Sequence, residues 1–584
     1  MTQPPQPPNQ PHQPNQAPQP QPPQGGFGAP QDPPPGGFGA PTPPPEGPGY
    51  GYPQAPPGHP GRPAGYGYPQ APGQPHTQPM GQQPYGYGYP TQPVQPHFMP
   101  PQPRKKLSTQ TQIIIAAVVA VLLIVATGVW FASTDGSDDA KGKRPQNGSQ
   151  GGADGNKPGG GGSEKVPSNT KSKTLVNIPQ PKVDDLVVVE GSWLTDTVYA
   201  KSDVLKVVGY DLSAGSVKWT LPLPGQICGA ARHVSDNRTA ILFEPAKRAG
   251  KNDHQDCSEV GVIDLATGKM AWTGSAKGAN SGDKKVEFRE ISLSGGTVAA
   301  GGLEGGAAWN LADGKSLWVP TADTESCYDL GYGGGAALAA VRKCGDYGSQ
   351  YLLVQNLNPK TGAPVSSYKM PPGVEYASIV STGPLVVAAD VGDTAGDGSG
   401  ISDFFSIDEK TGKLKAKIAA DADRYAAECR STEVESCSMA VVGNGRLYLP
   451  TEEHEGTGEY GDTNEIVSFD LTTGKPTTDR ADAGDRYTLF PLRMDGGNII
   501  AYKWPPYDAG GQIVSIDGGS MKQTVLMENP AGEDVRDAET SFSVDAAEIL
   551  YGNGRLFLAE TLISKPYSDD PGRKDYLVVS FATG

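Results

Sequence analysis

From about residue 174 onward, the chain alternates short runs of small and β-branched residues with turns rich in Gly, Asp and Asn. Examples of the apolar runs are GTVAAGG, GRLYLP and GRLFLAE. Short runs of this composition, bounded by turn residues and without helical spacing, are typical of β-strands. The pattern therefore predicts an all-β domain over residues 174–584.

One phrase recurs within this domain: a strand-like run ends at Asp or Asn, turns through Gly, and resumes toward Trp. It reads VVGYDLSAGSVKW, GVIDLATGKMAW and AAWNLADGKSLW, and later copies lack the Trp. The turn glycines are Gly215, Gly268, Gly314, Gly362, Gly412, Gly474, Gly519 and Gly584. Their spacing of about 45 to 65 residues is that of one propeller blade with variable loops. We expect an eight-bladed β-propeller, with seven blades as the alternative because the first and last units are incomplete.

Simple chemistry explains why such a phrase repeats. The Asp or Asn accepts a hydrogen bond from the backbone two residues on, the Gly tolerates positive φ, and the Trp fills the wedge between blades. Where Lys415 and Thr477 replace the Trp, the wedge must be filled differently. The residues to which we assign these turn and packing roles are Asp211, Gly215, Trp219, Asp264, Gly268, Trp272, Gly314, Trp318, Asp408, Gly412, Asp470 and Gly474.

The last copy of the phrase stops at Gly584, so no outer strand follows it. An open ring would expose unpaired strand edges. We expect the segment Thr174–Val183 to supply the missing outer strand.

The N-terminal third has a different character. Residues 1–107 are dominated by Pro, Gln, Gly and Tyr, which predicts a disordered tail. Residues 112–132 contain an uncharged apolar run, long enough at about 1.5 Å per residue to cross a bilayer as a signal-anchor helix. Residues 133–173 are polar and Gly-rich, which predicts a flexible linker.

Two observations predict the orientation in the membrane. Arg104, Lys105 and Lys106 precede the apolar run, and basic residues stay on the cytoplasmic side. All cysteines follow the run and fall into three local pairs, which suggests disulfides in an oxidising compartment. These pairs are Cys228 with Cys257, Cys327 with Cys344, and Cys429 with Cys437. We expect a single-pass cell-membrane protein with a cytoplasmic N-terminus and an extracytoplasmic propeller.

Net charge narrows the choice of partners. The formal net charge is −16, and the acidic excess lies after the apolar run. Nucleic-acid binding needs a basic face, so the sequence argues against it. The Pro-rich tail is either a solvated spacer or a ligand for aromatic grooves.

The residues with chemical potential form no recognisable catalytic set. Trp504 and Tyr507 lie in the Pro-stiffened loop KWPPYDAGG and are candidates for contact with a glycan or peptide. Two acidic loops are candidates for Ca²⁺, although neither has the spacing of a known calcium loop. They contain Asp390, Asp393, Asp397 and Asp403, and Glu452, Glu453, Glu455, Glu459 and Asp462. We expect no catalytic residues.

The D-x-x-T-G-x-x-x-W phrase resembles the repeat of pyrroloquinoline quinone (PQQ) dehydrogenases and of the eight-bladed, BamB-like lipoprotein of the outer-membrane β-barrel assembly machinery. The resemblance covers roughly residues 185–584. With the Pro-rich tail and single span, the whole chain resembles membrane proteins of Gram-positive bacteria. Family resemblance implies a vicinal Cys-Cys disulfide, Ca²⁺ and a catalytic Asp in the enzymes, but this chain has no adjacent cysteines. We therefore expect no PQQ.

The sequence favours a membrane-anchored binding or scaffold module for a cell-envelope protein or glycan. The alternative is an extracellular enzyme, either a quinone-dependent oxidoreductase or a glycan-acting one. Carboxylates and Trp504 gathered at one mouth of the channel would favour the enzyme. A channel lined by Gly and Ala would favour the scaffold.

Overall fold

The computed structural model describes residues 162–584 except 251–252, 279–280, 322–324, 393, 396–400, 422, 431, 457–460 and 566–573. The predicted tail, the predicted membrane span and most of the predicted linker lie outside the described residues. Within the described part of the chain, no helix combines the length and the apolar character needed to cross a bilayer.

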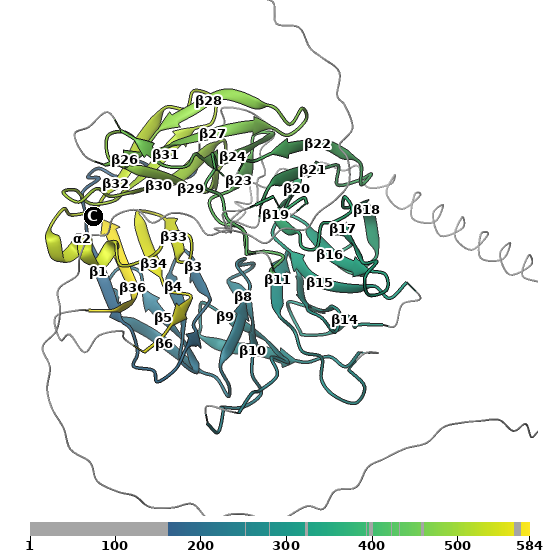
Figure 1. The fold of residues 1–584 in the computed structure, drawn as a ribbon. Coiled ribbons are helices and arrows are strands. Elements are labelled where there is room, and N and C mark those ends of the chain that lie inside the picture. Colours follow the sequence, from purple (N-terminus) through teal and green to yellow (C-terminus); the bar gives the residue numbers. More distant parts are fainter. Residues whose placement is uncertain are drawn as a thin grey trace, which may run out of the picture. The chain divides into compact units, whose positions relative to one another are not determined.

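The described residues form eight four-stranded antiparallel sheets that follow one another around a ring (Figure 1). This confirms the eight-bladed propeller, and the seven-bladed alternative is wrong. Successive strands of a blade pair with each other from the centre outward. The hydrophobic clusters lie between blades: one joins Leu242 of the second blade to Leu293 of the third.

The first four blades follow chain order. Blade 1 contains β3 (Ser192–Leu194), β4 (Val198–Asp203), β5 (Lys206–Asp211) and β6 (Val217–Pro222). Blade 2 contains β7 (Ile227–Ala230), β8 (Arg238–Phe243), β9 (Glu259–Asp264) and β10 (Lys269–Gly274). Blade 3 contains β11 (Glu290–Ser294), β12 (Thr297–Gly301), β13 (Ala307–Asn310) and β14 (Ser316–Trp318). Blade 4 contains β15 (Tyr328–Gly333), β16 (Leu338–Cys344), β17 (Tyr351–Leu357) and β18 (Pro364–Lys369).

The remaining blades complete the ring. Blade 5 contains β19 (Ser378–Thr382), β20 (Leu385–Ala389), β21 (Asp403–Ile407) and β22 (Leu414–Ala419). Blade 6 contains β23 (Val441–Gly443), β24 (Arg446–Pro450), β27 (Glu465–Asp470) and β28 (Pro476–Asp482). Blade 7 contains β29 (Thr488–Asp495), β30 (Asn498–Trp504), β31 (Gln512–Asp517) and β32 (Gln523–Glu528). Blade 8 contains β33 (Glu548–Gly552), β34 (Arg555–Ala559), β36 (Tyr576–Thr583) and β1 (Ser172–Pro179).

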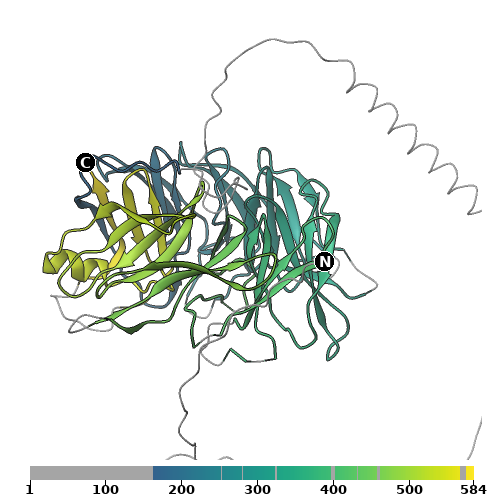
Figure 2. The same cartoon turned by 90° about the horizontal axis from the view of Figure 1, so that it is seen from above.

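Two small pairs and one helix supplement the blades. The pairs are β2 (Val187–Val188) with β35 (Leu562–Ile563), and β25 (His454–Glu455) with β26 (Asp462–Thr463). The helix α2 (Glu533–Glu539) lies between blades 7 and 8, at the outer edge of the ring (Figure 2). Its buried Glu539 accepts hydrogen bonds from Tyr502 Oη and Gly511 N, which fixes the helix to blade 7.

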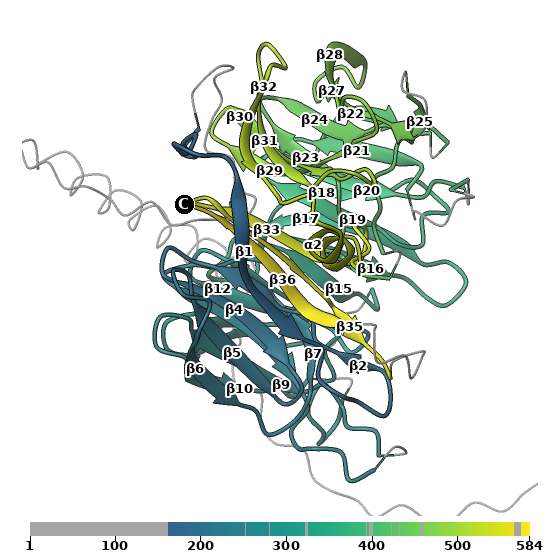
Figure 3. The ribbon, with the colours of Figure 1, turned by 90° about the vertical axis from the view of Figure 1, so that its left-hand side faces the viewer.

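The first strand of the domain closes the ring. β1 pairs antiparallel with β36, from Ser172 opposite Thr583 to Pro179 opposite Tyr576 (Figure 3). This confirms that an N-terminal segment supplies the outer strand of the last blade, and the strand begins two residues before the expected Thr174. Upstream of β1, Ser163 N and Glu164 N donate to the carboxylate of Asp495 at the first turn of blade 7.

The strand order gives the propeller two different faces. The turn face carries the Asp-x-x-x-Gly turns and the turns between the first and second strands of each blade. The loop face carries the connections between blades and the loops between second and third strands. The long segments 244–258, 420–440, 505–511 and 529–547 all belong to the loop face.

The repeat phrase links each blade to the next. Trp219 of blade 1 donates from Nε1 to Leu265 O in blade 2, and its ring covers Gly268. In the same way, Trp272 of blade 2 donates from Nε1 to Leu311 O in blade 3, and its ring covers Gly314. A Cβ on Gly314 would lie 2.7 Å from Cδ2 of Trp272. The turn glycine is thus required by the neighbouring Trp as well as by its positive φ.

Where the Trp is missing, other groups take its place. A Cβ on Gly474 would lie 2.5 Å from the carbonyl oxygen of Lys417, so the preceding blade's backbone fills the space there. Gly412 faces the backbone of Ser367 in the same way. At Gly215 the neighbour is Val176 of β1, 2.8 Å from the position of a Cβ. The closing strand therefore fills the place that Trp fills elsewhere.

The turn of blade 7 differs from our expectation. We assigned Gly519 as its turn glycine, but Met521 holds the positive φ of 57°. Met521 N donates to Asp517 O, which is the bond that Gly268 N makes to Asp264 O. Gly519 N donates to the Asp517 carboxylate instead. Assignment by the nearest glycine was wrong because the turn is defined by its distance from the Asp.

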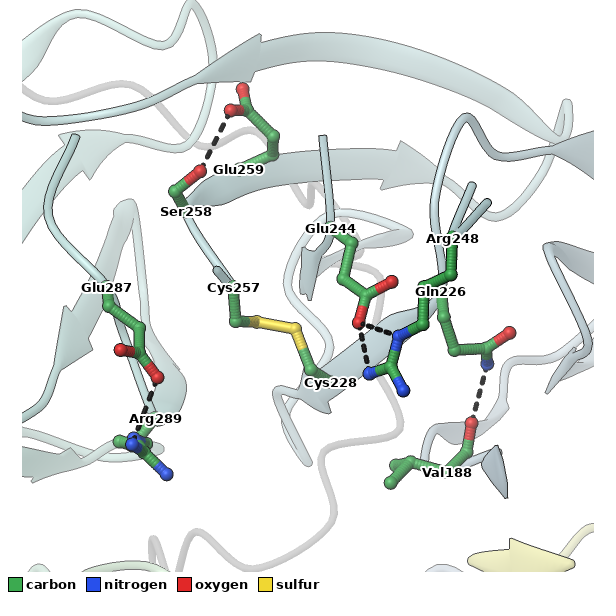
Figure 4. The surroundings of a disulfide bond; sticks show 10 residues. All are labelled: Val188, Gln226, Cys228, Glu244, Arg248, Cys257, Ser258, Glu259, Glu287 and Arg289. Carbon is green, nitrogen blue, oxygen red and sulfur yellow. Dashed lines mark hydrogen bonds and ion pairs between the residues drawn. A yellow bond between two sulfur atoms is a disulfide. The ribbon is translucent and has the colours of Figure 1, made fainter. Parts of the chain in front are cut away.

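All six cysteines form disulfides, and each pair is local in the sequence. The bonds are Cys228–Cys257, Cys327–Cys344 and Cys429–Cys437. Figure 4 shows the first, which ties the inner strand β7 to the loop before β9. Gln226 and the Glu244–Arg248 ion pair lie beside it in the same view. The first bond therefore fixes a long loop to the inner strand of its own blade.

Candidate functional site

The most distinctive loop of the molecule enters the centre of the ring. We call residues 428–438, between β22 and β23, the plug. Its ends pair where Ser438 N donates to Glu428 O over 2.8 Å, and the Cys429–Cys437 disulfide closes it. The backbone of Val434 contacts blade 5, where Ile379 N donates to Val434 O over 2.6 Å. The plug is therefore a closed loop seated against the inner strands.

Glu435 holds the tip of the plug to three blades. Its carboxylate lies 2.8 Å from His233 Nε2 in blade 2 and accepts from Ser292 Oγ in blade 3 over 2.6 Å. It also accepts from Gly334 N in blade 4 over 2.8 Å. Burial raises the pKa of this carboxyl, but His233 and these donors outweigh burial and hold the pKa below its usual value. Glu435 is therefore ionised at neutral pH.

Glu290 holds the plug from the inner strand β11. Its carboxyl group accepts from Val434 N at 2.7 and 2.8 Å and from Glu435 N at 3.2 Å. Desolvation, with smaller contributions from the neighbouring Glu433 and Glu435, outweighs these hydrogen bonds and raises the pKa of Glu290 to about 8. Glu290 and Glu435 thus differ in charge at neutral pH although both touch the same loop.

Two axial cavities lie on opposite sides of the plug. One, of about 150 Å³, is lined by first turns such as Gly334, Thr382 and Gly383, which belong to the turn face. The other, of about 310 Å³, is lined by the loop-face ends of inner strands, including Ser192, Phe490 and Glu548. The plug thus separates the two ends of the channel.

The loop-face cavity continues into a neighbouring one of about 310 Å³. We call the two together the mouth groove. They share Glu428, Met439, Phe490, Val544 and Asp545. The acidic residues lining the mouth groove are Glu190, Glu428, Glu452, Glu453, Asp545 and Glu548, and the basic ones are Arg232 and Arg430. The groove is therefore acidic, with an apolar floor.

Glu190 is the most unusual residue of the groove. Desolvation, together with the nearby carboxylates of Glu548 and Glu433, raises its pKa to about 7 against the opposing effect of Arg232 and Arg430. Among the described residues, no group donates a hydrogen bond to the Glu190 side chain. Its carboxyl group is therefore free to change protonation state near neutral pH.

Glu548 is held differently. It forms an ion pair of 2.8 Å with Lys201, whose side chain is 1% exposed, and Lys201 Nζ also donates to Val189 O. Gly191 N donates to the other carboxylate oxygen of Glu548 over 2.9 Å. These bonds join blades 8 and 1 behind Glu190. Glu548 is therefore held in the wall by an ion pair and a backbone hydrogen bond.

The aromatic residues expected to contact a ligand are separated by the structure. Trp504 lines the mouth groove and packs edge-on against Tyr502, with ring centroids 6.2 Å apart. Tyr507 is 67% exposed, lies outside both cavities, and carries the Arg486 guanidinium 5.5 Å from its ring centroid. Trp504 thus gathers with the carboxylates at one mouth of the channel, whereas Tyr507 does not.

The two candidate calcium loops are only partly described. Asp390 accepts from Thr394 N and Ala395 N, and Asp403 pairs with Lys417 at 3.0 Å. Asp393, Asp397 and Glu459 lie outside the described residues. Within the part of the chain that the structure describes, no three His, Cys, Asp or Glu side chains are placed to hold a metal ion.

Sequence reasoning did not identify the plug, Glu190 or Arg232 as parts of a site. Two signals were available. The connection from residue 420 to 440 is long for a link between blades and carries its own cysteine pair. Glu190 interrupts the apolar run LVVVEGSW. A charged residue is rarely buried within such a run unless it has a partner or a function.

Comparison with known proteins agrees with this architecture. Residues 256–501, from just before β9 into β30, match a family model described as outer membrane protein assembly factor BamB. Comparison with curated protein sequences returned no match.

Several solved structures contain chains that are similar to this one. BamB from Moraxella catarrhalis is 11% identical, with 70% of this chain and 100% of that chain covered and a TM-score of 0.33. A quinohemoprotein alcohol dehydrogenase from Pseudomonas putida is 12% identical, with 71% and 78% covered and a TM-score of 0.38. A europium-containing methanol dehydrogenase is 10% identical, with 72% and 99% covered and a TM-score of 0.34.

The repeat phrase, the eight sheets and the family match agree with one another. The described residues therefore form an eight-bladed β-propeller of the PQQ-repeat type.

Proposed function

We propose that this chain is a membrane-anchored, extracytoplasmic binding or scaffold module that recognises a cell-envelope partner through the loop face of its propeller. The observation that carries the proposal is the plug, which closes the channel and leaves two adjoining cavities of about 310 Å³ each open on the loop face. Recognition on that face uses loops positioned by a rigid scaffold, as is usual for binding sites. The apolar run at 112–132 and the disulfides support the anchored, extracytoplasmic placement.

The groove does not fit PQQ. This cofactor is a flat tricarboxylate, and the carboxylates of Glu190, Asp545 and Glu548 would repel it. The three disulfides join cysteines 29, 17 and 8 residues apart, so none is the vicinal disulfide of the quinone enzymes. We therefore propose a role that does not depend on this cofactor.

Site-specific photocrosslinking tests the recognition face. A photoreactive residue replaces Asp545 at the mouth groove in the full-length membrane protein, and a second variant carries it at Lys360 on the turn face. Crosslinking to a defined partner from Asp545 but not from Lys360 is the expected result. Equal capture from both positions, or from neither, would contradict the proposal. Protease digestion of intact cells should remove the propeller if it lies outside the membrane.

A glycan-acting enzyme is the second candidate. Carboxylates and Trp504 gather at one mouth, and Glu190 has a pKa of about 7, which suits a general acid or base. If this is correct, the purified protein cleaves a panel of chromogenic glycosides, and Glu190→Gln lowers kcat by about 10²- to 10⁴-fold. Absence of turnover on the whole panel, with binding retained, would favour the module.

A further inference from the structure

The charged residues that line the mouth groove are mostly acidic. Six carboxyl-bearing residues line it against two arginines. Arg430 pairs with Glu433 of the plug and Arg232 donates to Cys437 O, and both arginines also lower the pKa of Glu190. Burial also raises the pKa of Glu453, and Asp462 raises it further. Acidic residues therefore outnumber the basic residues that line the groove.

The walls of the groove suit an organic cation better than a metal ion. Ca²⁺ takes six to eight oxygen ligands at short range, whereas the described carboxylates of this groove form no such cluster. Trp504, Phe490 and Met439 provide an apolar surface beside the acids. Such a surface can cover an alkyl stem, and an aromatic face attracts a cationic head.

We propose that the mouth groove binds the cationic side chain of a lysine or arginine residue on the partner protein, with Glu190 facing the charged group. This inference deepens the proposed binding function and rests on it. Glu428 and Asp545 stand at the rim shared by the two cavities, where the flanking backbone of the partner would pass. The Glu548–Lys201 pair supports the wall behind Glu190.

Protonation of Glu190 makes the proposal measurable. In the free protein, Glu548 and Glu433 face this carboxyl group and oppose ionisation, whereas Arg232 and Arg430 favour it, and desolvation raises the pKa to about 7. A bound cation stabilises the ionised form and lowers that pKa. Binding therefore releases a proton below pH 7, so affinity rises with pH up to about 7 and then levels off.

The test uses the full-length protein in detergent and the peptide acetyl-Lys-Lys-Lys-amide as the probe. Calorimetry at pH 7.5 and 5.5 should show binding that is roughly twenty-fold tighter at the higher pH, as follows from a group with a pKa of about 7. The peptides acetyl-Glu-Glu-Glu-amide and Nε-acetylated tri-lysine should not bind. Binding of the acetylated peptide, or affinity independent of pH, would overturn the proposal.

Two variants and a matched control locate the site. Glu190→Gln should weaken tri-lysine binding about ten-fold at pH 7.5 and flatten its pH dependence, since one charge contact in a partly desolvated groove is removed. Asp545→Asn should weaken binding while keeping the pH dependence. Glu375→Gln, at an exposed position that lines neither cavity, should leave both unchanged. Matching thermal unfolding curves confirm that each variant is folded.

The outcomes separate this inference from the function on which it rests. Crosslinking of a partner at Asp545, combined with no tri-lysine binding, rejects the cationic ligand and keeps the binding module. Tri-lysine binding that Glu190→Gln does not change places the cation elsewhere and also rejects the inference. Failure of crosslinking together with failure of tri-lysine binding rejects both.

Discussion

At the scale of single residues, the propeller depends on contacts between a turn and the blade before it. Trp219 covers Gly268 and donates to Leu265 O, so one indole provides both apolar contact and a hydrogen bond across the blade boundary. The Asp of the turn is held as an ion: Asp211 accepts from Ser213 Oγ and the following backbone, which lowers its pKa. The recurring phrase is therefore a joint between blades as well as a turn within one.

Replacing Gly268 tests whether a turn glycine is required by its positive φ alone or also by its contact with the neighbouring Trp. Gly268→Ala should lower the free energy of unfolding by about 2 to 4 kcal/mol, because φ is positive and the new methyl group meets Trp219. Gly295 also has a positive φ, of 52°, but open space surrounds it. Gly295→Ala should therefore lower the free energy of unfolding by only about 1 to 2 kcal/mol. Urea unfolding measures both, and equal losses would show that the Trp contact contributes nothing.

At the scale of elements, the plug converts an open channel into a closed one through contacts between distant parts of the chain. Its backbone and Glu435 reach inner strands and turns of blades 2 to 5. The stability of the plug's position therefore depends on the charge states of the side chains that bind it. Glu290 is one such group, because its pKa of about 8 lies within the accessible pH range.

Titration of Glu290 should make stability depend on pH. Its pKa is about 8 in the folded protein, against 4.5 as the ordinary value, so the folded state keeps a proton that the unfolded state has released. Unfolding free energy should therefore fall as pH rises from about 4.5 to 8. In Glu290→Gln this fall should be smaller, most clearly between pH 7 and 8, where the contribution of Glu190 is already declining.

Urea midpoints at pH 5, 6.5, 7.5 and 8 measure this effect. Glu375→Gln serves as the control, because an exposed carboxyl group should leave the pH profile parallel to that of the wild type. A steeper decline in Glu290→Gln than in the wild type would show that the sign is wrong.

At the scale of the whole molecule, the ring is closed by pairing residues from its two ends. β1 adds the outer strand of blade 8, and Val176 of β1 occupies the place beside Gly215 that Trp occupies in other blades. Closure removes the unpaired edge that an open stack of sheets would expose. The same strand therefore completes one blade and seals it to the next.

Internal deletion of residues 172–179 tests closure. The free energy of unfolding should fall by about 3 kcal/mol or more, since at least two aliphatic side chains of β1 lose contacts and each contributes about 1.5 kcal/mol. Deletion of eight residues from the Gly-rich stretch 150–157 should leave unfolding unchanged. Differential scanning calorimetry compares the two, and equal melting temperatures would show that β1 is dispensable.

Local patterns were enough to predict the blades but not the centre of the ring. The turn phrase and the missing last strand predicted eight blades and closure by β1, because neighbouring repeats follow one another in the sequence. The error at Gly519 arose from counting glycines, whereas Met521 adopts the turn geometry. The plug could not be predicted, because the bond from Ser292 to Glu435 joins residues 143 positions apart and has no periodic signal.

The position at which the chain joins the ring has a mechanical consequence. Residues 163–164 bind at the turn face, and β1 then runs along blade 8 toward the loop face. Tension between an upstream tether and a ligand on the loop face would pull β1 along its own length. Ladder hydrogen bonds lie perpendicular to that direction, so they would be loaded together in shear rather than broken one at a time. Such a load would therefore be shared by the whole β1–β36 ladder.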